Sequence, residues 1–214
     1  MSAAIQPIPL TLADLDEAAG VLGRATVNDP IFVYCLPDKA DREWGVPRIQ
    51  RAFLKLGMRQ GEAWSTPRPI TGVAWCITAE VPNFSPQEVE AAGLTAAGTG
   101  WGEEAFARFL EFRDDIREFA AGFGEWPHWH LAWIGVEPRE QGRGISSAFM
   151  RQLTSQTDAA GIDCDLFNFV PRNVALYEHF GFDVSSDTIL PRTGLRLWSM
   201  IRKPNPAPGT AHGV

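Results

Sequence analysis

The chain alternates between stretches in which apolar residues have helical spacing and stretches in which they have strand-like spacing. Apolar positions three or four residues apart, which form one face of an amphipathic helix, are clearest in "EEAFARFLEFRDDIREFAAGF" and "ISSAFMRQLTSQTDAAG". Gly161 closes the second stretch, as glycine commonly does at a helix end. The helices predicted in this way span residues 11–22, 42–61, 86–92, 103–123, 145–161 and 173–181.

Short runs rich in β-branched and aromatic residues predict strands. The run "HWHLAWIGVEP" is apolar at both alternating sets of positions, which is typical of a central strand covered on both faces. Its two faces are expected to carry Trp129, Leu131 and Trp133 on one side, and Ala132, Ile134 and Val136 on the other. The predicted strands span residues 62–66, 70–80, 128–138, 163–170 and 196–203.

The order of these elements predicts an α+β fold. We expect one domain over residues 1–203, with a mixed, mostly antiparallel sheet of six to seven strands flanked by helices. Residues 204–214 are rich in proline and small polar residues, which predicts a disordered C-terminal tail. Residues 81–102, rich in Pro, Gly, Ala and Thr, predict a loop that is either a lid over a site or a connection.

The charge of the chain narrows the classes of partner. The net charge of −7 argues against binding to nucleic acid or to an anionic membrane, because both call for a basic surface. There is no apolar run long enough to cross a bilayer and no basic, apolar leader, so we expect a cytoplasmic protein. The three cysteines lie far apart, which predicts neither a disulfide framework nor a metal site.

The segment "VEPREQGRGISSAFM" places two glycines directly before a predicted helix. The first N–H groups of a helix have no partners within it, and Gly142 and Gly144 would let a ligand approach them closely. Such a turn favours phosphate oxygens, and Arg139 and Arg143 would add positive charge. A tight turn without a ligand explains the same glycines. The segment is not a P-loop, and Ser147 breaks the dinucleotide-binding pattern.

Gly135 lies inside the strand that precedes this turn. Glycine weakens a strand and often marks a bulge or a close backbone approach. A splayed strand at this point would leave main-chain groups free to bind an extended ligand. Pyrophosphate at the helix and an amide-rich chain along the strand correspond to the shape of coenzyme A.

Two motifs carry a family resemblance. "REQGRG" and "NVALYEHFGF" resemble, in this order, the two signatures of the GNAT superfamily of N-acetyltransferases. Residues 128–203 as a whole are most similar to the branch that includes puromycin N-acetyltransferase. The resemblance implies the GNAT fold with a splayed central strand. It also implies direct transfer of an acetyl group from acetyl-CoA to the primary amine of a small molecule, and it is compatible with a homodimer.

The resemblance also implies roles for individual residues. Tyr177 would donate a proton to the departing thiolate, which suits the ordinary pKa values of a phenol and a thiol. The residues expected to bind acetyl-CoA are Ile134, Gly135 and Val136 through the main chain, Gln141, Gly142, Arg143, Gly144, Ile145 and Ser146 through their amides, Arg139 through its charge, and Asn173.

The general base is left open between several residues. Members of the superfamily often use a carboxylate near the start of the central strand, where this chain has His128 and His130. Histidine has a suitable intrinsic pKa for this role, although a histidine on a strand is more often structural. Glu137 and Glu125 are weaker candidates.

One departure from the branch bears on the function. Phe167 stands where the puromycin-type branch commonly has a glutamate, so we do not expect puromycin as the acceptor. The alternative function is a non-catalytic acyl-CoA-binding or sensor domain of the same fold. Tyr177 beside Asn173 favours catalysis, whereas Phe167 favours the alternative.

Overall fold

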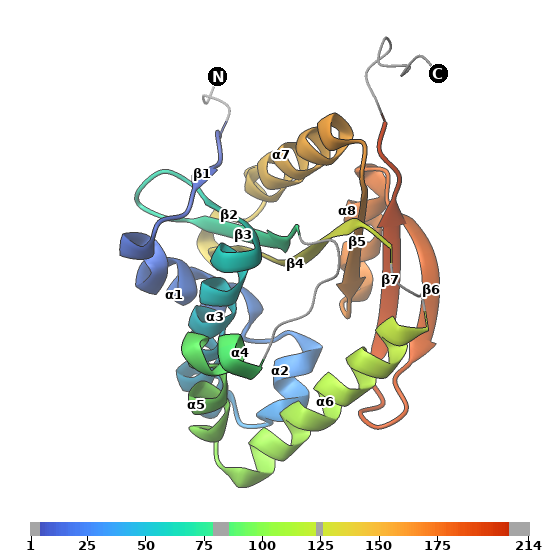
Figure 1. Ribbon diagram of the computed structural model, residues 1–214. Helices are drawn as coiled ribbons and strands as arrows, with labels where there is room; N and C mark the ends of the chain where they lie inside the picture. Colours follow the sequence, from blue (N-terminus) through green and yellow to red (C-terminus); the bar gives the residue numbers. More distant parts are fainter. Residues whose placement is uncertain (1–4, 79–85, 123–125, 206–214) are drawn as a thin grey trace.

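The computed structural model describes residues 5–78, 86–122 and 126–205. Seven strands form one sheet in the order β1-β2-β3-β4-β5-β7-β6 (Figure 1). Only β4 and β5 pair in parallel, which confirms the predicted mixed, mostly antiparallel sheet. The strands are β1 (Ile8–Pro9), β2 (Gly61–Ser65), β3 (Gly72–Ile77), β4 (His128–Val136), β5 (Asp163–Asn168), β6 (Asp183–Ile189) and β7 (Arg196–Arg202).

Helices cover both faces of the sheet (Figure 1). On one face α1 and α3 contact the first half of the sheet, and on the other α7 contacts β3, β4 and β5. None of the helices in the described part of the chain is both long and apolar enough to span a membrane. The α-helices are α1 (Leu15–Thr26), α2 (Pro30–Cys35), α3 (Lys39–Gln60), α4 (Pro86–Ala92), α5 (Leu94–Thr99), α6 (Glu103–Ala121), α7 (Ile145–Ala160) and α8 (Val174–His179).

Several elements differ from the sequence predictions. Helices α2 and α5 and strands β1 and β6 were not predicted. Within the predicted loop over 81–102, the helix predicted over 86–92 is confirmed as α4, α5 is additional, and residues 81–85 lie outside the described part of the chain. The predicted tail lies outside it too, apart from residues 204 and 205.

A bulge in β4 overturns the predicted assignment of its faces. Trp75 pairs with Trp133, and the next residue, Cys76, pairs with Leu131, so Ala132 is an extra residue in β4. An extra residue reverses the alternation of side chains beyond it. Leu131 therefore packs in the core beneath α7, whereas Trp133 stacks on Phe32 of α2, on the opposite face.

The two central strands separate after a short stretch of pairing. The last pair between β4 and β5 is Leu131 with Leu166, although β4 continues to Val136. This divergence is the predicted splay. Gly135 is not the bulge; it allows a close approach instead, because a Cβ atom there would lie 2.8 Å from Leu22 Cδ2 of α1.

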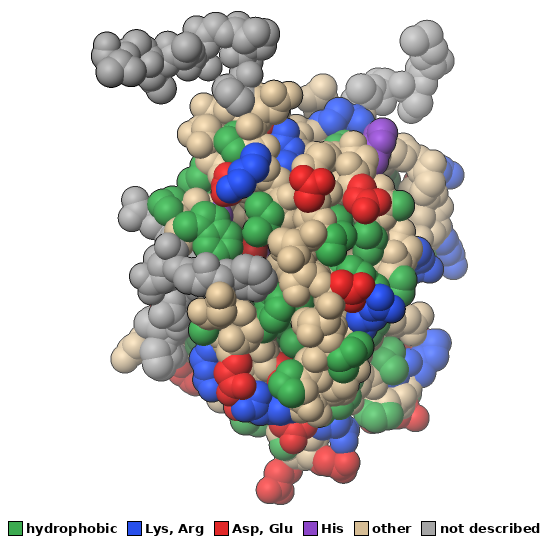
Figure 2. All heavy atoms as spheres, turned by 90° about the vertical axis from the view of Figure 1, so that its right-hand side faces the viewer, with side chains coloured by type: hydrophobic (Ala, Val, Ile, Leu, Met, Phe, Trp, Pro, Cys, Tyr) green, Lys and Arg blue, Asp and Glu red, His purple; other side chains and the backbone are tan. Residues whose placement is uncertain are grey.

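Helix α6 runs across the molecule below the sheet and is fastened at one end to the turn between β6 and β7 (Figure 1). The buried carboxylate of Asp115 accepts hydrogen bonds from the backbone N–H groups of Arg192 and Thr193 and from the Thr193 hydroxyl. Glu118 pairs with the Arg192 guanidinium at 2.6 Å. On the neighbouring outer face, acidic, basic and apolar side chains are interspersed (Figure 2).

Candidate active site

A cavity of about 1380 Å³ lies at the divergence of β4 and β5. It reaches both faces of the sheet, because its walls include Tyr177 from the α7 side and Trp133 from the α2 side. Further wall comes from α6, from the turn between α1 and α2, and from side chains of α3, β3, α4 and α5. The gap between the strands therefore joins two compartments.

His130 and Asp165 form a hydrogen-bonded pair in this cavity. They are register partners on β4 and β5, and His130 Nδ1 lies 2.8 Å from Asp165 Oδ1. An ionised carboxylate only accepts hydrogen bonds, so Nδ1 carries a proton, and in the neutral ring Nε2 is then the nitrogen with the lone pair. The Asp165 side chain is 5% exposed, and the edge of the His130 ring packs against Phe167. His130 is therefore held in the tautomer of a proton acceptor.

His128 has both ring nitrogens turned toward protein groups. Its Nδ1 lies 2.7 Å from the carbonyl oxygen of Trp126, and its Nε2 lies 3.5 Å from Asp165 Oδ1. The Trp126 ring also stacks on it at 4.2 Å. These contacts favour a structural role for His128 and leave His130 as the better candidate base. Sequence reasoning missed Asp165, although its spacing from Asp163 repeats that of the two histidines.

Tyr177 lies on the opposite side of the gap, in α8. Its side chain is buried and packs against Phe182, and it also lines the cavity. Burial raises the pKa of the Tyr177 hydroxyl above its ordinary value, and the nearby Asp29 carboxylate adds to the rise. The hydroxyl therefore stays protonated at neutral pH. Asn173 also lines the cavity, and its side chain does not cap α8.

Asp29 is a second carboxylate that the sequence analysis did not single out. It is the N-cap of α2, where one oxygen accepts a hydrogen bond from Ile31 N at 3.0 Å, and it faces the cavity. Burial raises the pKa of Asp29 to about 6. The signal for it was present in the sequence as aspartate before proline, a frequent helix start.

The glycine-rich turn follows the divergence of the strands. Gly142 and Gly144 have φ values of 77° and 79°, and a Cβ atom at either would meet nothing within 4 Å. No described side chain caps the N-terminus of α7, which begins at Ile145, so its first N–H groups are available to a ligand. Ser146 follows in the same turn of the helix. The turn therefore has both the open space and the donors that an anion requires.

The remaining residues of this region are held by local contacts. Gln141 Nε2 donates to Val136 O at 3.3 Å, and the Arg143 guanidinium pairs with Glu140 at 2.9 Å. Arg139 is exposed. Arg24 of α1 binds Glu137, which is thereby a less suitable base. Glu125 lies outside the described residues.

Along β4, the stretch expected to bind the cofactor arm keeps one neighbour. Ile134, Gly135 and Val136 pair with β3, but the sheet pairing with β5 has ended before them. Their edge toward β5 borders the cavity, of which Ile134 is part of the wall. An extended, amide-rich ligand would find room there.

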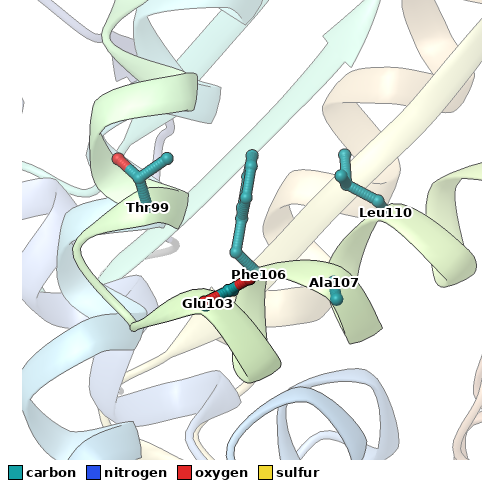
Figure 3. A pocket seen from close by; sticks show the side chains of 5 residues that line it. All are labelled: Thr99, Glu103, Phe106, Ala107 and Leu110. Carbon is teal, nitrogen blue, oxygen red and sulfur yellow. The ribbon is translucent and has the colours of Figure 1, made fainter.

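A second hollow and the question of a metal site lie outside this cavity. A shallow hollow on the outer side of α5 and α6 is lined by Thr99, Phe106 and Leu110 and lies away from this cavity (Figure 3). Within the described residues, no group of three His, Cys, Asp or Glu side chains is placed to hold a metal ion.

Sequence comparison places these features in context. Residues 103–184 match the family model of the acetyltransferase (GNAT) domain. An uncharacterized N-acetyltransferase of Schizosaccharomyces pombe is 29% identical over 101 residues. That match spans 46% of this chain and 41% of the yeast protein, so it covers less than half of either.

Solved structures show the same fold over almost the whole chain. A histone acetyltransferase HPA2 and related acetyltransferase from Corynebacterium glutamicum has a TM-score of 0.63 and 17% identity, covering 95% of this chain and 98% of that one. The PaiA N-acetyltransferase of Thermoplasma acidophilum, solved in complex with coenzyme A, has a TM-score of 0.54 and 12% identity, covering 94% and 99%. At these identities the likeness concerns the fold alone.

Proposed function

We propose that this chain, whose residues 103–184 match the family model of the acetyltransferase (GNAT) domain, transfers an acetyl group from acetyl-CoA to the primary amine of a small molecule, within a ternary complex. One observation carries the proposal. A proton acceptor, His130 with Asp165, and a proton donor, Tyr177, line one cavity from the two sides of the strand gap. This pairing supports catalysis over the alternative of a non-catalytic acyl-CoA-binding domain.

The residues around the gap suit coenzyme A. The open turn at Gly142 and Gly144 offers backbone donors to the pyrophosphate, and the free edge of β4 from Ile134 to Val136 offers peptide groups to the pantetheine arm. Asn173 offers a side-chain amide on the same cavity wall. Acetyl-CoA, when bound, supplies an activated acetyl thioester.

The protein side of the reaction is then three proton transfers, one at His130 and two at Tyr177. His130 Nε2 takes a proton from the acceptor ammonium, so that the neutral nitrogen can form the new N–C bond. Tyr177 gives its hydroxyl proton to the sulfur as the C–S bond breaks. The second proton leaving the nitrogen restores the Tyr177 hydroxyl. Because burial raises the pKa of this hydroxyl, a phenolate would be costly, and the two transfers at Tyr177 must be closely coupled.

The first prediction concerns Tyr177. Tyr177→Phe removes the proton donor but keeps the packing against Phe182, so kcat should fall about 100-fold with acetyl-CoA affinity nearly unchanged. The measurement is thiol release over a panel of primary amines, with thermal melting to report cofactor binding. At a hundredfold excess over Kd, acetyl-CoA should stabilise the folded protein by about 2.7 kcal/mol.

The outcomes separate the two candidate functions. If millimolar acetyl-CoA leaves the melting temperature unchanged, both are wrong. A stabilised protein that acetylates no amine supports the non-catalytic alternative. Equal turnover by wild type and Tyr177→Phe removes Tyr177 from the rate-limiting step.

A further inference from the structure

The cavity contains one carboxylate that the steps above do not use. Among the described residues that line it, the acidic side chains are Asp29 and Asp165. Asp165 already contacts His128 and His130 through Oδ1. Within the described residues the Asp29 carboxylate has a single hydrogen bond, from Ile31 N to Oδ1, and no ion pair. Its second oxygen is therefore available to a ligand.

Asp29 lies close to the centre where the acetyl group would be transferred. Its charge acts on the Tyr177 hydroxyl, and both side chains line the same cavity. Removal from water makes a lone carboxylate costly, as the rise of its pKa to about 6 shows. A cation that entered the cavity would relieve this cost, because it would pair with the carboxylate.

The wall beyond Asp29 is apolar and aromatic. Trp133 of β4 lines the cavity there, and the fully buried Phe32 of α2 stacks on it from the core with 5.4 Å between ring centroids. Phe112 and Ile116 of α6 face the same space. An aromatic or aliphatic body would bury its surface there, whereas a second positive charge on it would meet the guanidinium groups of Arg113 and Arg117, which also line the cavity.

We propose that Asp29 holds the ammonium group of the acceptor, and that the acceptor is an apolar amine without a carboxylate beside its nitrogen. The inference rests on the proposed function and gives it a substrate class. Asp29 sets the position of the nitrogen, and the aromatic wall at Trp133 selects the body that follows it. An α-amino acid would bring its own carboxylate against Asp29 and is disfavoured by charge repulsion.

The second prediction tests Asp29 directly. Asp29→Asn removes the charge but keeps an equally good helix cap, so folding should be preserved. We expect kcat/KM for phenethylamine to fall between about tenfold and a hundredfold, mainly through KM, because a hydrogen bond to a charged group is lost. Asp29→Glu should recover part of the loss.

A matched control exists one helix further along. Asp38 caps α3 in the same way, accepting from Ala40 N at 2.7 Å, but it is exposed and lies outside the cavity. Asp38→Asn should leave kcat/KM within twofold of wild type. Equal losses in Asp29→Asn and Asp38→Asn would overturn the inference.

A comparison of two amines tests the substrate class. Phenethylamine and phenylalanine share one body and differ by the carboxylate, so phenethylamine should be acetylated at least tenfold better. Equal rates would overturn the class. Calorimetric binding of phenethylamine to the coenzyme A complex is measured alongside. Binding that is lost in Asp29→Asn supports the inference even without turnover, and absent turnover would then count against the proposed function alone.

Discussion

Two histidines at neighbouring positions of one strand have different surroundings. His128 has both nitrogens directed at protein groups, whereas His130 shares only Nδ1 with Asp165 and turns its ring toward the cavity. Asp163 lies opposite His128 and Asp165 lies opposite His130, but both rings contact Asp165, and only His128 also contacts the carbonyl oxygen of Trp126.

The third prediction separates these histidines. His130→Gln should lower kcat about 100-fold, because a glutamine accepts no proton from an ammonium. His128→Gln should keep most of the activity and lower the melting temperature instead. Asp165→Asn should also lower kcat, because an amide can favour the other tautomer of His130. Steady-state kinetics with the best amine checks all three, and equal kcat losses for the two histidine variants would contradict the assignment.

At the scale of an element, the two turns that flank α7 differ in the main-chain groups beside them. Gly142 precedes the helix and Gly161 ends it, and both have positive φ with open space around the Cβ position. Only the first of the two stands beside free N–H groups. The two glycines therefore form a matched pair.

The fourth prediction uses this pair. Gly142→Ala and Gly161→Ala should each cost about 1 kcal/mol in free energy of unfolding, because alanine is strained at positive φ. Only Gly142→Ala should weaken acetyl-CoA binding, since its methyl group enters the space proposed for the pyrophosphate. Thermal melting and calorimetry report the two quantities separately. Wild-type affinity in Gly142→Ala would refute the anion site.

At the scale of the whole molecule, the cavity wall formed by α6 is held by a distant anchor. The backbone and side-chain donors of Arg192 and Thr193 converge on the Asp115 carboxylate. Burial alone would raise the pKa of Asp115, but the hydrogen bonds from Thr193 and Arg192 outweigh it, and the pKa lies below its ordinary value. The ionised form is thus the one that ties α6 to the sheet.

The fifth prediction follows from the lowered pKa of Asp115. Because the pKa of Asp115 is lower in the folded protein than in the unfolded chain, its ionised form stabilises the fold. This stabilisation is complete above the pKa of an aspartate in the unfolded chain, about 3.9, and is lost as the pH falls through the pKa of Asp115 in the folded protein. Asp115→Asn should cost about 2 kcal/mol at pH 7, because buried donors lose their acceptor, and the cost should shrink below about pH 4. Denaturant unfolding at several pH values measures it.

The control for this anchor is its neighbour in α6. Asp114 pairs with Arg117 at 3.0 Å on the surface, and such pairs contribute at most about 1 kcal/mol and commonly less. Asp114→Asn should therefore be nearly neutral at every pH. A similar loss in both variants would mean that Asp115 acts only through net charge.

The parts of the fold that depend on local chemistry could be predicted from the sequence. Gly142, Gly144 and Gly161 all adopt positive φ where a turn or a helix end was expected, and α7 and β4 lie close to their predicted bounds. The spacing of apolar residues and the positions of glycines determine structure over a few neighbouring residues, so they can be recognised in a single sequence.

The parts that depend on pairing between strands could not be predicted. The bulge at Ala132 arises from how β3 and β4 meet, and it moved Trp133 to the face opposite Leu131. Asp165 reaches His130 only through the parallel register of β4 and β5. Helix α2 is six residues long, too short for a periodic pattern, and Asp29 was missed with it.

The bulged strand β4 also has a consequence for how such a protein can change over time. Under the proposed function its peptide groups from Ile134 to Val136 serve the donor, and these groups are nearly the same whatever side chains they carry. The side chains of His130 and Trp133 serve the acceptor. A substitution can therefore alter the choice of amine without disturbing the acetyl donor. Relatives of this chain should share their donor far more widely than their acceptors.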